Sequence, residues 1–212
     1  MYKLHTGDGR MRYGVILFLV LGSAGLACCR GGDKPPTVTV VERDPSWAAP
    51  LEGKGLSNFF RVSETLYRGA QPSSEGINTL KKMGVKTVVN LRNLHSDRDE
   101  ISDIDMAYVH IRFNPWKPDE NEVVSFLRTV TDPDGAPYFV HCQHGADRTG
   151  MMVAIYRMVV QGWSRDDAMK EMLDGGYGFH KVWKDIQEYV RSVDVKALKS
   201  RLVPAVAETG KE

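Results

Sequence analysis

Residues 141–150 read HCQHGADRTG and bring a cysteine, two histidines, an aspartate and an arginine into one short stretch. The stretch follows an apolar strand-like run at 138–141 and leads into an apolar helix-like run at 149–161. A loop from the carboxyl end of a strand to the start of a helix presents backbone N–H groups to anions, and the helix dipole favours the same charge. No Gly-Lys-Ser/Thr ends the loop, so it is not a nucleotide-type phosphate loop. The sequence therefore predicts a site for a tetrahedral oxyanion.

The spacing of Cys142 and Arg148 predicts nucleophilic chemistry at that oxyanion. Five residues separate them, enough for one turn of backbone to wrap around the anion. N–H donors and a nearby guanidinium favour the thiolate, which is the nucleophilic form of cysteine. The guanidinium of Arg148 can hold two phosphate oxygens at once. Gly145 permits the tight loop, and the hydroxyl of Thr149 can donate to the sulfur when it becomes the leaving group.

The pattern His141-Cys142-x5-Arg148-Thr149 resembles the active-site loop of cysteine-dependent protein tyrosine and dual-specificity phosphatases. The resemblance covers roughly residues 58–195. It includes the stretches LYRGAQP at 66–72 and VKTVVNLR at 85–92, which are similar to small bacterial dual-specificity members. It implies a metal-independent phosphomonoester hydrolase without a cofactor. Its substrates would be phosphotyrosine proteins, with phosphoserine and phosphothreonine proteins as a further class.

The resemblance also implies a role for each matching residue. Cys142 would attack phosphorus and form a phosphocysteine, and His141 would orient the loop. Arg148 and the loop N–H groups would stabilise the transition state electrostatically. The phosphate-binding set is then Gln143, His144, Gly145, Ala146, Asp147 and Arg148.

The resemblance also implies a general acid, an aspartate on a loop upstream of Cys142 that protonates the leaving oxygen. The stretch NPWKPD at 114–119 resembles the tryptophan-proline-aspartate loop of larger phosphatases with one residue inserted, which makes Asp119 the candidate. Asp119-Glu120-Asn121-Glu122 also reads as a capping box for the next helix, so Asp119 has a structural interpretation as well. Glu120, Asp97 and Asp99 are the alternatives.

Three competing interpretations stay open. Cys142 alone could be a buried structural cysteine, although Arg148 in register favours a working thiol. The loop could serve inositol phosphates or other small phosphoesters, or it could bind phosphate with little turnover.

Asp147 is expected at the rim, where its charge would disfavour densely anionic substrates. His141, Cys142 and His144 offer metal-ligand chemistry, but no second ligand pair at standard spacing accompanies them, so no metal is predicted.

The fold class follows from the order of elements. Strand-like and helix-like segments alternate from residue 57 to about 162, and helices follow. This order predicts an α/β domain with a central, mostly parallel sheet and helices on both faces. The segment VKTVVNL at 85–91 is apolar and β-branched, as in a buried strand.

The N-terminal segment predicts that the protein is exported from the cytoplasm. A charged head and a short apolar run at 15–21, followed by small residues, indicate a signal peptide at 1–28, and Cys28 resembles the lipid-bearing cysteine of bacterial lipoproteins. We expect a flexible tether at 29–56, the phosphatase domain at 57–202 and a loose tail at 203–212. The net charge of +1 argues against nucleic-acid binding. The expected location is the bacterial envelope, facing the periplasm on a lipid anchor.

Overall fold

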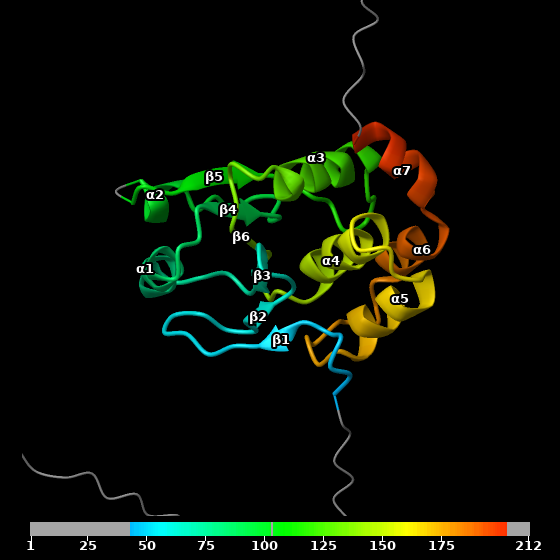
Figure 1. Cartoon of the computed structure of the whole chain (residues 1–212), viewed down its shortest axis with the longest axis horizontal. Coiled ribbons are helices and arrows are strands. Elements are labelled where there is room, and N and C mark those ends of the chain that lie inside the picture. Colours follow the sequence, from blue (N-terminus) through cyan, green and yellow to red (C-terminus); the bar gives the residue numbers. More distant parts are fainter. Residues whose placement is uncertain (1–42, 103, 203–212) are drawn as a thin grey trace, which may run out of the picture. The chain divides into compact units, whose positions relative to one another are not determined.

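A computed structural model of the chain describes residues 43–102 and 104–202 (Figure 1). The expected signal peptide, the lipidation candidate Cys28, the first part of the expected tether and the tail from 203 onward lie outside these residues. Within the described ranges, no helix combines the length and the apolar character that crossing a bilayer requires.

The centre of the domain is a six-stranded sheet with the order β1-β2-β3-β6-β4-β5. Strands β3, β6, β4 and β5 run parallel, and β1 and β2 extend one edge in antiparallel pairing. All residues of β4 and β6 are buried, which explains why the sequence shows them as apolar runs. The prediction of a mostly parallel sheet is confirmed. The strands are β1 (Ala49–Pro50), β2 (Phe60–Arg61), β3 (Leu66–Gly69), β4 (Thr87–Asn90), β5 (Ala107–His110) and β6 (Tyr138–His141).

Helices cover both faces of the sheet, as the sequence predicted (Figure 1). One face carries α1 (Ser74–Lys82) and α2 (Arg98–Ile101), which bury Ile77, Leu80 and Ile101. On the other face α4 (Asp147–Val159) is buried along nearly its whole length, because α5, α6 and α7 pack against it. The helices of this face are α3 (Glu120–Thr131), α4, α5 (Arg165–Asp174), α6 (Lys184–Ser192) and α7 (Val195–Leu202). A central buried helix positions the loop at its start rigidly.

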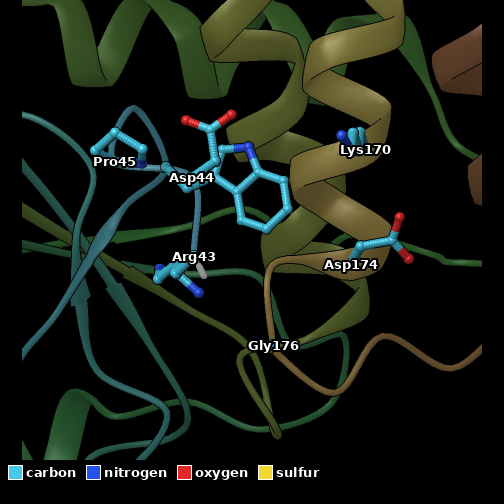
Figure 2. A pocket seen from close by; sticks show the side chains of 7 residues that line it. Arg43, Asp44, Pro45, Lys170, Asp174 and Gly176 are labelled. Atoms are coloured by element: carbon cyan, nitrogen blue, oxygen red, sulfur yellow. The ribbon is translucent and has the colours of Figure 1, made fainter. Parts of the chain in front are cut away.

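The expected tether at 29–56 is wrong for its last part, because residues 43–56 belong to the folded domain. Strand β1 pairs with β2, and Ala48 is buried. Arg43 donates to Ala48 O at 2.7 Å and to Tyr177 Oη at 2.9 Å. The segment also faces α5 across a hollow of about 780 Å³ (Figure 2). Its Pro- and Gly-rich composition signals irregular backbone, and long-range hydrogen bonds still hold that backbone on the domain.

Candidate active site

The loop that carries Cys142 lies at the carboxyl end of the central strand β6. That strand ends at His141, and α4 begins at Asp147. Cys142 is 2% exposed and is a free thiol, while Arg148 is half-buried in the first turn of α4. The strand–loop–helix arrangement expected from the sequence is therefore present, with the thiol recessed below the surface.

Three consecutive carbonyl groups of the loop accept hydrogen bonds from residues outside the loop. Gln143 O accepts from the backbone N–H of Gln71 at 3.2 Å, and His144 O accepts from Asn58 Nδ2 at 2.8 Å. Gly145 O accepts from Arg68 Nη2 at 2.7 Å. In a trans peptide the carbonyl and the following N–H point in opposite directions. The N–H groups of residues 144–146 are therefore turned to the opposite side from these carbonyls, which is the preorganised donor set that an oxyanion needs.

Gly145 is the residue that allows this loop to close on the sheet. Its φ is +70°, in the left-handed region that favours glycine. A Cβ at this position would lie 2.4 Å from the carbonyl of Gly69 and 2.6 Å from Ala70 N. Both backbone conformation and space thus require glycine where the loop crosses β3.

Arg68 is a buried cation beneath the loop. It is 0% exposed, and its guanidinium lies 3.7 Å from the centre of the Tyr177 ring. Burial lowers the pKa of Arg68, and the nearby Tyr177, Glu171 and Cys142 oppose that shift. Burial likewise raises the pKa of Tyr177 to about 12. The arginine therefore ties the loop to β3 and places positive charge behind the thiol.

His141 is held from below by a carboxylate. Its Nε2 lies 2.7 Å from Asp97 Oδ2, and both side chains are fully buried. Asp97 also accepts from Gln71 Nε2 at 2.5 Å. Burial raises the pKa of Asp97, but the hydrogen bonds and charges of His141 and of its other partners outweigh burial and hold that pKa below the ordinary 3.8. This contact holds the His141 ring in place and engages the Asp97 carboxylate.

The pocket above the loop is small and has a mixed lining. It has a volume of about 330 Å³ and is lined by Pro115, Gln143, His144, Asp147, Arg148, His180, Val182 and Trp183. A neighbouring hollow of about 210 Å³ shares Gln143 and Arg148 and adds Arg92 and Leu94. Thr149 Oγ1 is buried without a hydrogen-bond partner among the described residues, which leaves it available to the sulfur. Arg148 lines both hollows and Arg92 lines the second, so two guanidinium groups stand beside the loop.

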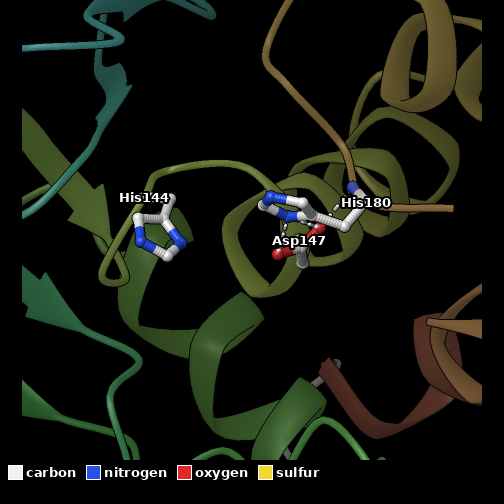
Figure 3. Close-up of side chains that lie close together, drawn as sticks. All are labelled: His144, Asp147 and His180. Carbon is white, nitrogen blue, oxygen red and sulfur yellow. Dashed lines mark hydrogen bonds and ion pairs between the residues drawn. The ribbon is translucent and has the colours of Figure 1, made fainter. Parts of the chain in front are cut away.

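Asp147 lines the pocket, but it is not the exposed rim charge expected from the sequence. It is 8% exposed and accepts from the backbone N–H of His180 at 2.8 Å. The His180 ring also contacts it, with Nδ1 2.9 Å from Oδ2 (Figure 3). The sequence did not reveal this pairing, because His180 follows Asp147 by 33 positions and belongs to no motif.

The remaining acid candidates lie apart from the pocket lining. Asp119 is exposed and caps α3, accepting from Asn121 N at 2.7 Å, so the capping interpretation is correct. Glu120 contacts Arg201 at 2.6 Å, and Asp99 is exposed on α2. Pro115 of the same 114–119 segment does line the pocket, so this segment reaches the site four residues before Asp119.

The residues that hold the loop were missed as functional residues. Arg68 and Gln71 fall in the stretch 66–72 that carried the family resemblance, and this was the signal that could have identified them. Asn58 has a φ of +50°, a conformation that asparagine tolerates better than most residues, but nothing in the sequence links it to His144.

Comparison with known proteins agrees with this geometry. Over residues 51–185 the chain matches the family described as a DSP-PTPase phosphatase fused to NAD+ kinase. It is 35% identical over 186 residues to the dual specificity protein phosphatase TpbA of Pseudomonas aeruginosa (strain UCBPP-PA14), covering 87% of this chain and 82% of TpbA.

Solved structures show the same fold. The crystal structure of P. aeruginosa TpbA has 34% identity and a TM-score of 0.68, covering 74% of this chain and 97% of that one. The catalytic domain of the PP-IP phosphatase SIW14 from S. cerevisiae, at 20% identity and a TM-score of 0.60, covers 68% of this chain and 92% of its own, and shares the fold. Matched in its sequence, its sheet and its cysteine loop, the chain belongs to the dual-specificity protein phosphatases.

Proposed function

We propose that the protein hydrolyses phosphomonoesters of proteins, phosphotyrosine first, through a phosphocysteine intermediate and without a metal. The Sγ of Cys142 attacks phosphorus, the S–P bond forms, and the bond to the ester oxygen breaks as that oxygen gains a proton from a general acid. Water then attacks phosphorus and gives a proton back to the general acid, the S–P bond breaks, and inorganic phosphate leaves with the thiolate restored. Arg148 and the loop amides stabilise the charge on the three oxygens that do not react.

The observation that carries this proposal is the recessed thiol inside a loop whose carbonyls are held outward. Asn58, Arg68 and Gln71 fix these carbonyls before substrate arrives. Donors that are already oriented need no reorganisation in the transition state, and this is where electrostatic catalysis gains most. A merely structural cysteine would need neither the held carbonyls nor Arg148.

The apolar rim supports an aromatic phosphoester. Trp116 is 66% exposed and contacts Trp183 edge-on, with ring centroids 4.6 Å apart. Val182 beside them is 68% exposed, and Leu94 is exposed on the other side of Arg148. A phosphotyrosine side chain is long enough to reach the recessed Cys142 while its ring packs against this rim. A crystal structure of P. aeruginosa TpbA in complex with pTyr, matched at 34% identity, supports the same substrate class.

Inositol phosphates are the competing substrate class. Arg92 and Arg148 both face the site, and a relative from Arabidopsis thaliana that is 26% identical is an inositol diphosphatase. Val182 and Trp183, which line the pocket, favour a protein substrate, because a polar polyphosphate gains nothing from apolar contacts. A phosphate-binding module with little turnover is the third possibility.

The test is phosphate release by the full chain, with EDTA present, from phosphotyrosine and phosphothreonine peptides and from inositol phosphates. We expect metal-independent release that is fastest on phosphotyrosine and abolished by Cys142→Ser, whereas Cys29→Ser, the matched control, keeps the rate. Faster release from inositol phosphates than from either phosphopeptide would show that the protein is an inositol-phosphate phosphatase. Phosphopeptide binding with no release by the unaltered chain would overturn hydrolysis and leave a recognition module.

We also propose that Cys28 carries a lipid that holds the domain at the bacterial envelope, facing the periplasm. The support is the sequence pattern of a charged head, a short apolar run and a cysteine after small residues. Expressed in a bacterium, the chain and its Cys29→Ala variant should enter the detergent phase, whereas Cys28→Ala should stay in the aqueous phase. Equal partitioning of all three forms would exclude Cys28 as the anchor.

A further inference from the structure

Two histidines and an aspartate gather at the mouth of the phosphate pocket. The ligand atoms of His144, Asp147 and His180 all lie within 4.8 Å of one another. They come from three places: the loop, the first turn of α4 and the segment after α5 (Figure 3). All three line the pocket together with Arg148.

The chemistry of this set suits a divalent transition metal. Imidazole and carboxylate are normal zinc ligands, with bonds of about 2.0–2.2 Å. Two atoms bound to one tetrahedral zinc ion lie about 3.3–3.6 Å apart, so the cluster must close by about 1.5 Å at its widest. His144 is exposed, and its ring makes no hydrogen bond within the described part of the chain, so it can supply that movement. Asp147 is anchored by the backbone N–H of His180 and keeps the other side of the site in place.

A purely structural role explains only two of the three side chains. Asp147 and His180 pair directly and tie the segment after α5 to α4. The His144 ring takes no part in that tie, yet its centroid lies 5.8 Å from that of His180. The set differs from the one suggested by sequence spacing, because His141 is buried against Asp97 and cannot join it.

We propose that His144, Asp147 and His180 bind Zn²⁺ at the mouth of the pocket, and that the bound ion inhibits the phosphatase. Three protein ligands leave a fourth position open, as in many zinc sites. Since all three ligands line the pocket, that position faces the space that a phosphate oxygen enters. The ion would block the entrance or retain phosphate there. The carboxylate of Asp147 offsets the repulsion between the ion and neighbouring Arg148. The inhibition by Zn²⁺ rests on the proposed phosphatase function, whereas the binding of Zn²⁺ to these three residues does not.

The test uses the full chain with Cys28 and Cys29 replaced by serine in every form, so that their thiols do not compete for metal. Phosphotyrosine peptide hydrolysis is measured against Zn²⁺ without chelator, and EDTA is then added. We expect inhibition that EDTA reverses. The double variant His144→Gln, His180→Gln should need at least about tenfold more Zn²⁺ for half inhibition of its own activity. His110→Gln, which removes a histidine of β5, should respond like the parent.

Binding is measured separately with Co²⁺ in the Cys142→Ser form, which lacks the catalytic thiol. We expect a visible absorption band that titrates to one ion and is lost in the double histidine variant. Equal half-inhibition by Zn²⁺ in parent and double variant, or no Co²⁺ binding in the Cys142→Ser form, would overturn the site and assign any inhibition to the thiolate. If the parent releases no phosphate, the proposed function fails, and the Co²⁺ titration still decides the metal site.

Discussion

At the scale of single residues, the reactivity proposed for Cys142 depends on residues that hold its loop from outside. Asn58 and Arg68 each hold one carbonyl of the loop, and the backbone of Gln71 holds a third. Gln71 also donates to Asp97, which in turn holds His141. Cys142 and the loop around it therefore form one preorganised unit, so we expect small displacements of its supports to weaken the proposed catalysis without removing any reacting group.

Asp119 is the sequence candidate for the general acid although it lies outside the pocket lining, and asparagine separates that role from its capping role. Asparagine caps a helix about as well as aspartate, so Asp119→Asn should leave the melting temperature unchanged. It should lower kcat on a phosphothreonine peptide by about 10²-fold or more, since an alkoxide cannot leave without a proton. On p-nitrophenyl phosphate, whose phenolate leaves unaided, the loss should be much smaller.

The control for Asp119→Asn is Asp99→Asn, which removes an exposed carboxylate from α2. We expect its kcat to match that of the parent on both substrates. If Asp119→Asn slows neither substrate, or slows both equally, Asp119 is only the cap of α3. His180, whose ring lines the pocket, would then be the next donor to substitute.

At the scale of elements, a buried ion pair joins the two helices next to the site. Arg157 of α4 donates through Nε to Glu171 of α5 at 2.7 Å and through Nη2 at 2.8 Å. Glu171 also accepts from Ala48 N at 2.7 Å and from Tyr177 Oη at 2.9 Å. One carboxylate thus connects α4, α5, the N-terminal segment and the residue that stacks on Arg68.

Removing that carboxylate should destabilise the fold in a pH-dependent way. Burial raises the pKa of Glu171, but Arg157 and the other donors outweigh it and hold that pKa below the ordinary 4.5. Its stabilisation is therefore complete above about pH 4.5 and is lost as pH falls through the lower, folded-state pKa. Glu171→Gln should cost about 3–5 kcal/mol of unfolding free energy near neutral pH, because Arg157 stays buried without its partner. The difference from the parent should shrink in acid.

Urea unfolding of both proteins at neutral and acidic pH measures this difference. Glu188→Gln, an exposed position on α6, is the matched control and should change the free energy little at either pH. A small Glu171→Gln penalty would show that the pair contributes no net stability. A penalty that stays constant as pH falls below 4.5 would show that its contribution does not depend on the ionised carboxylate.

At the scale of the whole molecule, elements with a local signal were predictable and contacts between distant segments were not. Strands β4 and β6 are short apolar runs, and the Cys142–Arg148 spacing fixes the loop by itself. The supports of the loop depend on β3 lying beside β6, which no local pattern specifies. The burial of Asp147 and the docking of residues 43–56 likewise depend on partners far along the chain.

The separation in sequence between the loop and its supports has a consequence for how the protein is made. Asn58 and His144 are 86 residues apart, and Arg68 and Gly145 are 77 apart. At 5–20 residues per second, a ribosome needs about 4–17 s to go from Asn58 to its partner. During that time Asn58 and Arg68 lack the loop carbonyls to which they donate in the folded protein. Until β6 inserts beside β3, the loop around Cys142 lacks these supports, so the preorganised loop forms only in a molecule whose sheet has already paired.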